Sequence, residues 1–426
     1  MNPIRMAFCF RVFFLSVSMT MVQAQPARTA AQLGFTESFP PRRAIDLSKW
    51  DRGEDCRYAF QHISEIIPVA SISRGSGDAT ELPRDLRDLS EMTFKAPDGQ
   101  AITVRAMLDA TYTDGFIVLQ DGAVVFEKYY NGMTPETRHL LMSVSKSVTG
   151  TLAGILVNEG RLNPDKKVVD YIPELTNSPG FADATVREVL DMTTSIVFSE
   201  DYDDPAAEVQ LHEQATAGHG RTPIAQKGLY AFAQTIRKDE REHGEVFHYA
   251  SINTDVLGWM IQRASNQRFS EFMSQRVWSR LGAEHDAHLS VDSFGSPVTN
   301  GGFVITLRDL ARFGQMVLDD GVHNGQQIIP SGWIDDCRYN GKNSAWKPTK
   351  YAKKWPDGFY RNQWYVTRDD QGSFFAIGVN GQHLWVNPTS RVVIVKFSSF
   401  PVSAKLEPME LAIDGLDAIA RKLGID

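Results

Sequence analysis

The stretch "HLLMSVSKSVTG", His139–Gly150, places three serines around one lysine and decides how the rest of the chain is interpreted. From Leu141 onward apolar residues recur at three- and four-residue spacing, and Gly160 ends the run, a pattern that predicts a helix. Only residues three or four positions apart share a face of a helix. Among the three serines, Ser143 alone has this spacing from Lys146. We therefore expect these two side chains to meet.

The chemistry of this serine–lysine pair depends on burial. Lys146 opens a buried-looking helix, and burial lowers the pKa of a lysine because it disfavours the charged form. A neutral amine can take the proton of a serine hydroxyl and make it nucleophilic, and the N–H groups of a helix N-terminus favour an anionic intermediate. A helix whose serines only cap its first turn explains the local pattern equally well. A second Ser-x-x-Lys, Ser344 to Lys347, precedes Pro348 and is predicted to be an exposed loop.

Two further segments suit the same chemistry. "EVFHYASINTDVLGW" places Tyr249 just before a predicted helix, and a tyrosine hydroxyl beside a lysine can relay the serine proton to a leaving group. Taken alone, Tyr249 suits an aromatic core better. "FAIGVNGQHLW" is predicted to be a strand whose glycines let the backbone approach a ligand closely. The N–H of Val379 is then expected to form one half of an oxyanion hole, with the N–H of Ser143 as the other half.

Strand patterns lie early and late in the chain, with helical patterns between them. "GFIVLQDGAVVFEKYY" predicts a hairpin around Asp121–Gly122, and "GQHLWVNPTSRVVIVKFSSF" predicts a second strand pair that turns at Asn387–Ser390. A helix is expected to start at Thr306, and another closes the chain. This order predicts an α/β fold in which both ends of the chain build one antiparallel sheet flanked by helices, with a helical region inserted at about 160–300.

The N-terminal residues 1–24 resemble an export signal. Arg5 and Arg11 lie around the start of an apolar stretch that is too short to span a bilayer, and small residues follow at "VQA". An ordinary buried strand is the alternative. Residues 25–100 are expected to form an extension that packs on a catalytic unit at 101–426. The mature protein is then exported, periplasmic or secreted, and not inserted in a membrane.

Composition narrows the class of protein further. The 426 residues are 42% hydrophobic and 23% charged, which is ordinary for a soluble globular protein. A net charge of −8 without a basic stripe argues against nucleic acid as a partner. If Cys9 leaves with the signal, Cys56 and Cys337 either pair or stay free. His285 and His288 lack further ligands at metal-binding spacing, so we expect no metal or other cofactor. The sequence leaves open whether the chain is a monomer or a homodimer.

Ser-x-x-Lys, Tyr-x-Ser and the glycine-bearing segment, in this order, resemble the serine β-lactamase-like or penicillin-recognising family, especially class C β-lactamases and related esterases. Phrases such as "RHLLMSVSKS", "EDYDDPAAEVQ", "NTDVLGW", "RDLARFG" and "GQHLW" are more similar still to the 6-aminohexanoate-dimer (nylon-oligomer) hydrolases of that family. The similarity runs from about Tyr58 to the last strands. It implies a serine β-lactamase-like fold and a hydrolase that works through an acyl-enzyme.

Position by position, the resemblance also implies roles for single residues. Ser143 is the implied nucleophile, Lys146 the general base and Tyr249 the proton relay. The implied oxyanion hole consists of the N–H groups of Ser143 and Val379.

The resemblance implies substrate contacts as well. Tyr202 matches a loop tyrosine that closes over the substrate and hydrogen-bonds the scissile amide, Glu213 matches a carboxylate that pairs with a substrate ammonium, and Asn300 lines the same pocket. Asn380 is expected to bind substrate too, but it stands where class C β-lactamases carry a lysine that binds the lactam carboxylate. Tyr249-Ala250-Ser251 also lacks the terminal asparagine of those enzymes. Strong β-lactamase activity is therefore not expected.

The resulting expectation is a serine hydrolase for small amide or ester substrates, most similar to a 6-aminohexanoate-dimer-type amidase. A short-chain carboxylesterase that uses the same residues is the first alternative. A penicillin-binding or sensor module that stays acylated is an alternative of another class. The export signal is unexpected for a nylon-oligomer hydrolase and raises the question of a different natural substrate.

Overall fold

The computed structural model describes residues 49–216, 223, 226–404 and 406–425. The predicted export signal lies outside the described residues, as does the first part of the expected N-terminal extension. The described residues, from 49 onward, belong to one compact unit. In the part of the chain that the structure describes, no helix combines the length and the apolar character that crossing a bilayer requires.

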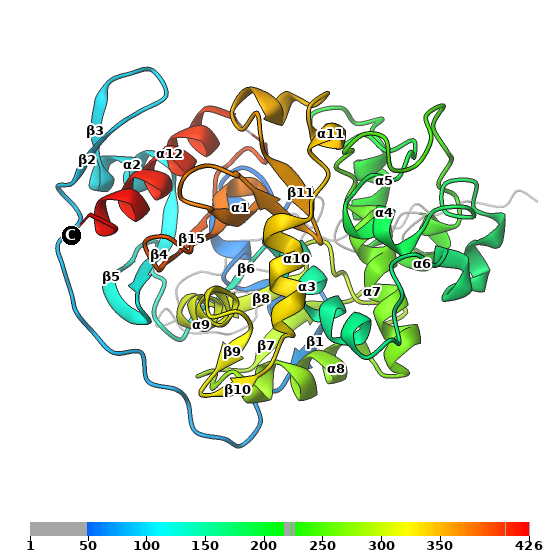
Figure 1. Ribbon diagram of the computed structural model, residues 1–426, viewed down its shortest axis with the longest axis horizontal. Coiled ribbons are helices and arrows are strands. Elements are labelled where there is room, and N and C mark those ends of the chain that lie inside the picture. Colours follow the sequence, from blue (N-terminus) through cyan, green and yellow to red (C-terminus); the bar gives the residue numbers. More distant parts are fainter. Residues whose placement is uncertain (1–48, 217–222, 224–225, 405, 426) are drawn as a thin grey trace, which may run out of the picture. The chain divides into compact units, whose positions relative to one another are not determined.

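A seven-stranded antiparallel sheet forms the centre of this unit, and it confirms the predicted sheet built from both ends of the chain (Figure 1). In spatial order the strands are β11 (Phe359–Arg361), β12 (Trp364–Val366), β13 (Phe374–Gly378), β14 (Gln382–Asn387), β15 (Val392–Ser398), β4 (Thr113–Gln120) and β5 (Ala123–Tyr129). The late strand β15 pairs with β4, and β4 pairs with β5, so the early hairpin forms one edge of the sheet.

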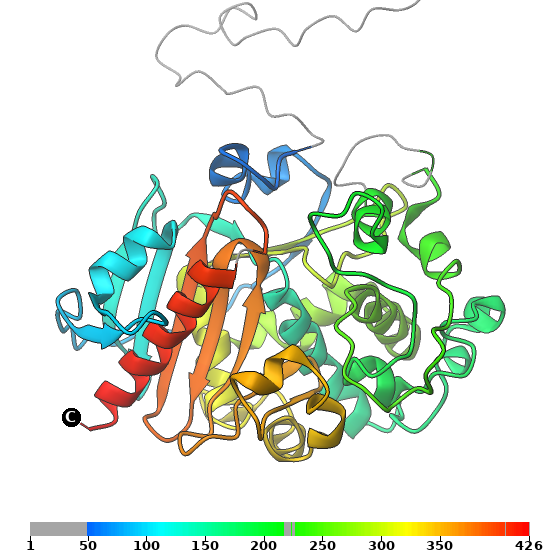
Figure 2. The ribbon, with the colours of Figure 1, turned by 90° about the horizontal axis from the view of Figure 1, so that it is seen from above.

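Helices cover both faces of the sheet, which explains why its strands are apolar without alternation. In β15, Val393 and Val395 pack in the cluster that contains α3 and α9, whereas Val392 and Ile394 pack in the cluster that contains α2 and α12. Figure 2 shows α12, in red, crossing the strands on its own face of the sheet. The four helices are α2 (Val104–Ala110), α3 (Val144–Asn158), α9 (Leu307–Leu318) and α12 (Leu406–Leu423).

Helix α3 is buried on all sides, and small residues make this possible. All residues from Val144 to Leu156 are buried. A methyl group added at Gly150 would lie 2.2 Å from the carbonyl oxygen of Asn362, in the connection between β11 and β12. Only a glycine therefore fits at this position of α3. The helix that carries Lys146 is therefore fixed by contacts around its full circumference, which leaves the lysine no path to solvent along the helix surface.

A second, four-stranded antiparallel sheet was not predicted from the sequence. Its order is β1 (Val69–Ile72), β7 (Ala287–Ser290), β8 (Phe303–Thr306) and β6 (Arg138–Leu140). Strand β6 leads directly into α3, and β1 belongs to the residues expected to form the N-terminal extension. The described part of that extension is therefore hydrogen-bonded into the fold through β7.

The helical region at about 160–300 and the remaining connections consist of the 14-residue helix α7 and shorter elements. They are α1 (Asp55–Ala59), η2 (Ile63–Glu65), β2 (Thr93–Lys95), β3 (Ala101–Thr103), η3 (Val168–Asp170), η4 (Pro173–Asn177), α4 (Val186–Leu190), α5 (Glu208–Ala215), α6 (Gly228–Ala233), α7 (Ile252–Ser265), α8 (Phe269–Arg276), η5 (Trp278–Arg280), β9 (Val322–His323), β10 (Gln326–Gln327), α10 (Ser331–Tyr339), α11 (Asn343–Trp346), η6 (Lys350–Lys353) and η7 (Val379–Gly381).

Two local predictions differ from the structure. "FAIGVNGQHLW" is not one strand: β13 and β14 pair with each other, and η7 turns between them. Asn380 and Gly381 both have positive φ, 59° and 90°, a conformation that asparagine and glycine adopt most readily and that reverses the chain here. Ser344 and Lys347 are exposed as predicted, but Ser344 belongs to the one-turn helix α11 rather than to a loop.

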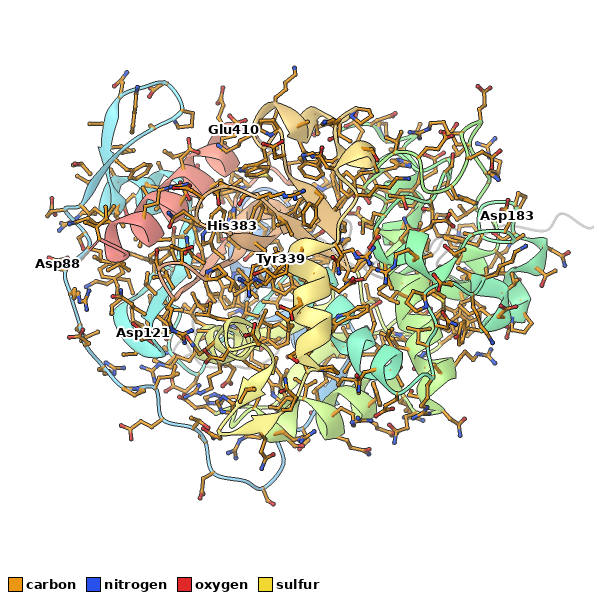
Figure 3. The ribbon with its side chains drawn as sticks, in the orientation of Figure 1. Asp88, Asp121, Asp183, Tyr339, His383 and Glu410 are labelled. Atoms are coloured by element: carbon orange, nitrogen blue, oxygen red, sulfur yellow. The ribbon has the colours of Figure 1, made fainter. Side chains whose placement is uncertain are left out.

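Figure 3 separates the interior from the surface of this unit. His383 of β14 lies among packed side chains, while Asp88, Asp121 and Asp183 lie at the periphery. His383 is 1% exposed, and burial lowers its pKa to about 3, so this imidazole is neutral. This buried neutral histidine on a strand of the central sheet is thus a core residue.

Candidate active site

A sharp turn between β6 and α3 presents Ser143. Strand β6 ends at Leu140, Met142 adopts a positive φ of 45°, and Ser143 is the N-cap of α3. A positive φ is unfavourable for methionine, and such strained residues persist where the surrounding structure holds them. The result is a serine side chain, 8% exposed, that lines a pocket at the N-terminus of a buried helix.

Lys146 contacts Ser143 as the sequence predicts. Its Nζ donates to Ser143 Oγ at 2.8 Å and to the carbonyl oxygen of Asn300 at 2.8 Å. The lysine is 1% exposed. Burial lowers its pKa to about 8, although the negative charges of Glu200 and Asp255 work in the opposite direction. A substantial fraction of Lys146 is therefore neutral at mildly alkaline pH and able to take the hydroxyl proton.

The two neighbouring serines have structural roles. Ser145 Oγ accepts a hydrogen bond from the backbone N–H of Phe303 at 3.2 Å. Ser147 Oγ donates to the carbonyl oxygen of Gln363 at 2.6 Å. Both hydroxyls thus hold α3 against other elements, and Ser143 is the one that lines the pocket.

Tyr249 lies just before α7, whose N-cap is Ser251, and faces the same pair. Lys146 Nζ is 5.2 Å from the centre of its ring. Burial, together with the charge of Glu200, raises the pKa of Tyr249 well above its usual value, and a hydrogen bond with Ser143 partly opposes this shift. The phenol is therefore protonated throughout the neutral range. Because the phenol of Tyr249 lies beside Ser143 and carries its proton, it can relay a proton between the serine and a leaving group.

The end of β13 approaches the N-terminus of α3 closely. A methyl group added at Gly378 would lie 2.8 Å from the carbonyl oxygen of Leu141 and 3.0 Å from the backbone nitrogen of Ser143. Val379 follows at once and lines the pocket beside Ser143. The backbone N–H groups of Ser143 and Val379 are thus brought to the same pocket, as an oxyanion hole requires.

The pocket holds three of the predicted substrate contacts and has a cavity volume of about 80 Å³. Glu213 and Asp51 are its acidic lining residues, and neither lysine nor arginine is among the described residues that line it. The lining consists of Trp50, Asp51, Ile67, Leu140, Met142, Ser143, Tyr202, Val209, His212, Glu213, Thr216, Ser251, Ser290, Val298, Asn300, Gly301, Gly302, Val379 and Ser403. This lining favours a substrate with an apolar body and a cationic end.

Tyr202 lines the pocket, but its hydroxyl is bound to the protein. It donates to Glu200 Oε2 at 2.8 Å, while Glu200 Oε1 accepts from the backbone N–H of Ser251 at 2.5 Å. Burial and the charges of Glu200 and Glu213 raise the pKa of Tyr202 well above its usual value. Tyr202 is therefore a protonated donor, held between the loop and the start of α7.

Asn380 does not line the pocket with the other predicted contacts. Its side chain is fully buried, and Nδ2 donates to the carbonyl oxygens of Phe400 at 2.7 Å and Asp51 at 3.2 Å. The amide thereby ties the turn after β13 to two other segments. We correct the expected substrate contact to a structural role, because the positive φ of Asn380 turns its side chain into the protein.

Sequence reasoning missed four residues that shape this site. Trp50 and Asp51 line the pocket from the segment expected to be an extension. Glu200 lies in a segment that the sequence presents as an acidic loop, and Asp255 is a charged residue inside the apolar pattern of α7. For Asp255 the sequence offered one signal, its charge within an apolar helical pattern. Burying a charged group without a partner is costly, so such a residue is expected to have specific partners.

Metal and disulfide chemistry receive no support from the described side chains. Among the described residues, no group of three or more His, Cys, Asp or Glu is arranged to hold a metal ion. Cys56 and Cys337, whose pairing the sequence leaves open, are both free and buried. Burial raises the pKa of each thiol to about 12, so neither is a thiolate at neutral pH.

Comparisons with known proteins identify the family of this chain. A sequence profile described as Beta-lactamase matches residues 103–416. The 6-aminohexanoate-dimer hydrolase of Paenarthrobacter ureafaciens is 39% identical over 355 residues, which cover 83% of this chain and 88% of that protein.

Solved structures show the same fold. A protein from Bacillus anthracis, described as a 6-aminohexanoate-dimer hydrolase, has a TM-score of 0.81 and 28% identity, covering 91% of this chain and 99% of its own. A protein from Bacteroides dorei, described as a β-lactamase, has a TM-score of 0.59 and 16% identity, covering 75% and 97%. At that level of identity, the second likeness concerns the fold alone.

Proposed function

The chain belongs to the β-lactamase family and is a serine hydrolase, and from this membership we propose that it cleaves small linear amides through an acyl-enzyme on Ser143. The observation that carries the proposal is the 2.8 Å contact between Ser143 Oγ and the buried Lys146 Nζ at the wall of the pocket. A neutral amine in this position supplies the base that a serine nucleophile needs.

The proposed reaction has two halves. Lys146 takes the proton of Ser143, Oγ attacks the carbonyl carbon, and the N–H groups of Ser143 and Val379 bind the oxyanion. Tyr249 relays the proton from Lys146 to the leaving nitrogen, the C–N bond breaks, and the amine departs from the ester formed on Ser143. Water then attacks this ester, giving up a proton to the same base, and the acid leaves as Ser143 regains its hydroxyl proton.

The preferred substrate in this proposal bears a free amine. Glu213 lines the pocket, and no lysine or arginine does so among the described residues, so an ammonium is favoured there over a carboxylate. A linear 6-aminohexanoate dimer has the required amine and amide, and two relatives are described by that substrate. β-Lactams depend on a carboxylate contact that Asn380, buried in the turn after β13, does not provide.

Glu213→Gln tests the amine preference. We expect kcat/KM for the 6-aminohexanoate dimer to fall about tenfold relative to a neutral short-chain p-nitrophenyl ester, as expected for one partly desolvated ion pair. Glu208→Gln, on the same helix and outside the pocket lining, is the matched control and should leave the ratio of the two substrates unchanged. A ratio that Glu213→Gln does not alter contradicts the amine preference.

A short-chain carboxylesterase is the second candidate, and one observation favours it. Tyr202, the residue expected to assist amide cleavage, donates its hydrogen bond to Glu200 instead of pointing it at a substrate position. An ester needs less assistance at its leaving group. Wild type and Ser143→Ala assayed with the dimer, the ester and a chromogenic cephalosporin separate the candidates. Cleavage of the ester alone identifies an esterase, and persistent acylation by the cephalosporin identifies a penicillin-binding module.

We also propose that the protein is exported. The basic start and short apolar stretch of residues 1–24 support this. Expression of the full chain in a Gram-negative host, followed by fractionation and intact mass measurement, should yield a periplasmic protein that begins near Gln25. A full-length chain that starts at Met1 in the cytosol contradicts export.

A further inference from the structure

Asp255 on α7 is a buried carboxylate behind the pocket with an unusual set of partners. It is 2% exposed and does not itself line the pocket. Oδ1 accepts from the backbone N–H of Asn300 at 3.0 Å and from Thr299 Oγ1 at 3.2 Å. Oδ2 accepts from Asn300 Nδ2 at 2.7 Å and lies 2.7 Å from His212 Nε2. One carboxylate thus holds both the backbone and the side chain of Asn300.

The backbone carbonyl group of Asn300 connects Asp255 to Lys146, the proposed general base. Its oxygen accepts from Lys146 Nζ at 2.8 Å. A carbonyl oxygen only accepts, so it must receive one N–H of the amine. The neutral amine has two N–H groups and one lone pair, and engagement of one N–H restricts rotation about the Cε–Nζ bond. The lone pair can then be directed at Ser143 Oγ, which is also 2.8 Å away.

His212 connects the same carboxylate to the proposed amine subsite. It precedes Glu213 on α5, and its ring packs at 5.6 Å from both Phe198 and Phe232. Because His212 is 2% exposed and bound to Asp255, the helix that carries Glu213 is attached to α7 at this point. A single buried group therefore links the residue that binds the substrate amine to the residue that activates the serine.

We propose that Asp255 is a positioning residue that, through Asn300, orients the Lys146 amine toward Ser143 and, through His212, fixes Glu213 in the same framework. This inference rests on the proposed function, since it assigns Asp255 to the base of that reaction. Asp255 touches no reacting atom and positions the amine only through its neighbours. Its carboxylate also contributes charge close to the base.

The charges around Lys146 give the sign of the expected pH effect. Glu200, from the loop before α5, and Asp255, from α7, are the negative groups whose fields favour the ammonium form. Tyr249 presents its ring and Ser143 its hydroxyl, and both are uncharged in the working range. Removal of the Asp255 charge therefore lowers the pKa of Lys146 further, and the acidic limb of the rate profile moves to lower pH.

The test is Asp255→Asn, assayed as kcat and kcat/KM against pH on a neutral p-nitrophenyl ester. We expect kcat on the alkaline plateau to fall about tenfold or more because the amine is misdirected, and the acidic limb to move down by about half a pH unit or more. A merely structural role for Asp255 lowers the melting temperature without moving the limb. A plateau at the wild-type level, or a limb that stays in place, overturns the proposal.

Two further variants keep the test decisive. Asp292→Asn is the matched control: Asp292 is also 2% exposed, and among the described residues its carboxylate accepts backbone N–H groups, from Leu229, Phe294 and Ser296, so the limb should stay in place. Asn300→Ala keeps the carbonyl but removes the bond from Nδ2 to Asp255. It should lower kcat several-fold without moving the limb, and a wild-type kcat overturns the proposal even if Asp255→Asn does not fold.

The ester assay separates failure of this inference from failure of the proposed function. If wild-type protein shows no Ser143-dependent ester cleavage, the proposed function fails. If wild type is active and Asp255→Asn behaves like wild type, the hydrolase assignment stands and the positioning role is wrong.

Discussion

Among the described residues there are two buried serine–lysine pairs, and one of the two faces a pocket. In the first, Lys146 donates to Ser143 at the N-terminus of α3. In the second, Lys396 of β15 donates to Ser398 and, at 3.2 Å, to the carbonyl oxygen of Thr111. Burial lowers the pKa of both amines, to about 8 for Lys146 and about 7 for Lys396. By proximity and protonation alone, the two pairs are equivalent.

The surroundings of the two hydroxyls distinguish them. Ser143 lines a pocket, and the backbone of Val379 lies beside it. Ser398 is fully buried within a central strand and lines none of the cavities described for this chain. A neutral amine next to a serine is therefore insufficient for catalysis. Access for a substrate and N–H groups that bind the oxyanion turn the first pair into a candidate nucleophile and base.

Removal of each hydroxyl gives the largest expected contrast. Ser143→Ala should lower kcat for a p-nitrophenyl ester by about 10⁴-fold or more, because the covalent route is lost. Ser398→Ala and Ser145→Ala should keep most of the activity, since each of these hydroxyls accepts a structural hydrogen bond inside the protein. Steady-state rates of the three purified variants decide the matter. Comparable losses in Ser143→Ala and either control contradict the distinction.

The two lysines provide the next contrast. Lys146→Met, close in shape and unable to accept a proton, should lower kcat by about 10³-fold, within the range for general-base catalysis. Lys396→Met should leave kcat close to wild type because no substrate reaches Ser398. The readout is kcat at pH 9, with melting temperatures to verify folding. A large loss of kcat in well-folded Lys396→Met would break the comparison.

The oxyanion hole can be tested through a glycine. In Gly378→Ala the new methyl group would lie 2.8 Å from Leu141 O and 3.0 Å from Ser143 N, so the two backbone segments must separate. We expect kcat to fall by about 10²-fold, as for the loss of one oxyanion donor. Gly332→Ala, where the methyl group meets nothing within 4 Å, is the control. Equal activity in both variants contradicts the proposed position of the hole.

The pH profile gives the smallest and most specific contrast. Below the pKa of about 8, only the neutral fraction of Lys146 acts, so kcat/KM for a neutral ester should rise about tenfold per pH unit and then level off. Lys396→Met should leave this limb in place. If the limb disappears in Lys396→Met, the titrating group is Lys396, and our assignment of the limb to Lys146 is wrong.

Local features of the fold were predictable because neighbouring residues determine them. Asp121 and Gly122 both have positive φ, 49° and 80°, as a two-residue hairpin turn requires. Thr306 caps α9 by accepting from the N–H of Asp309. The strands of the second sheet, such as β6 with three residues, are too short to show a period. Asn380–Gly381 carried a recognisable turn signal, yet the surrounding apolar residues favoured the interpretation as a strand.

The same division applies to the candidate site. Ser143 and Lys146 are three residues apart, so helical spacing alone brings them together. Glu200 reaches the N–H of Ser251, and Asp255 reaches Asn300, across dozens of residues. No local period reports such contacts, because they depend on how α7 packs against the loops around it. The reactive pair was therefore predictable, while the groups that tune and position it required the structure.

The most direct test of the account is to identify the acylated residue. Wild-type protein is mixed with an excess of a slowly deacylating p-nitrophenyl ester, quenched in acid within the first turnover, and analysed by intact mass and peptide mapping. We expect one acyl group per chain, located on Ser143. Turnover without a covalent adduct, or an acyl group on Ser145 or Ser398, would contradict it.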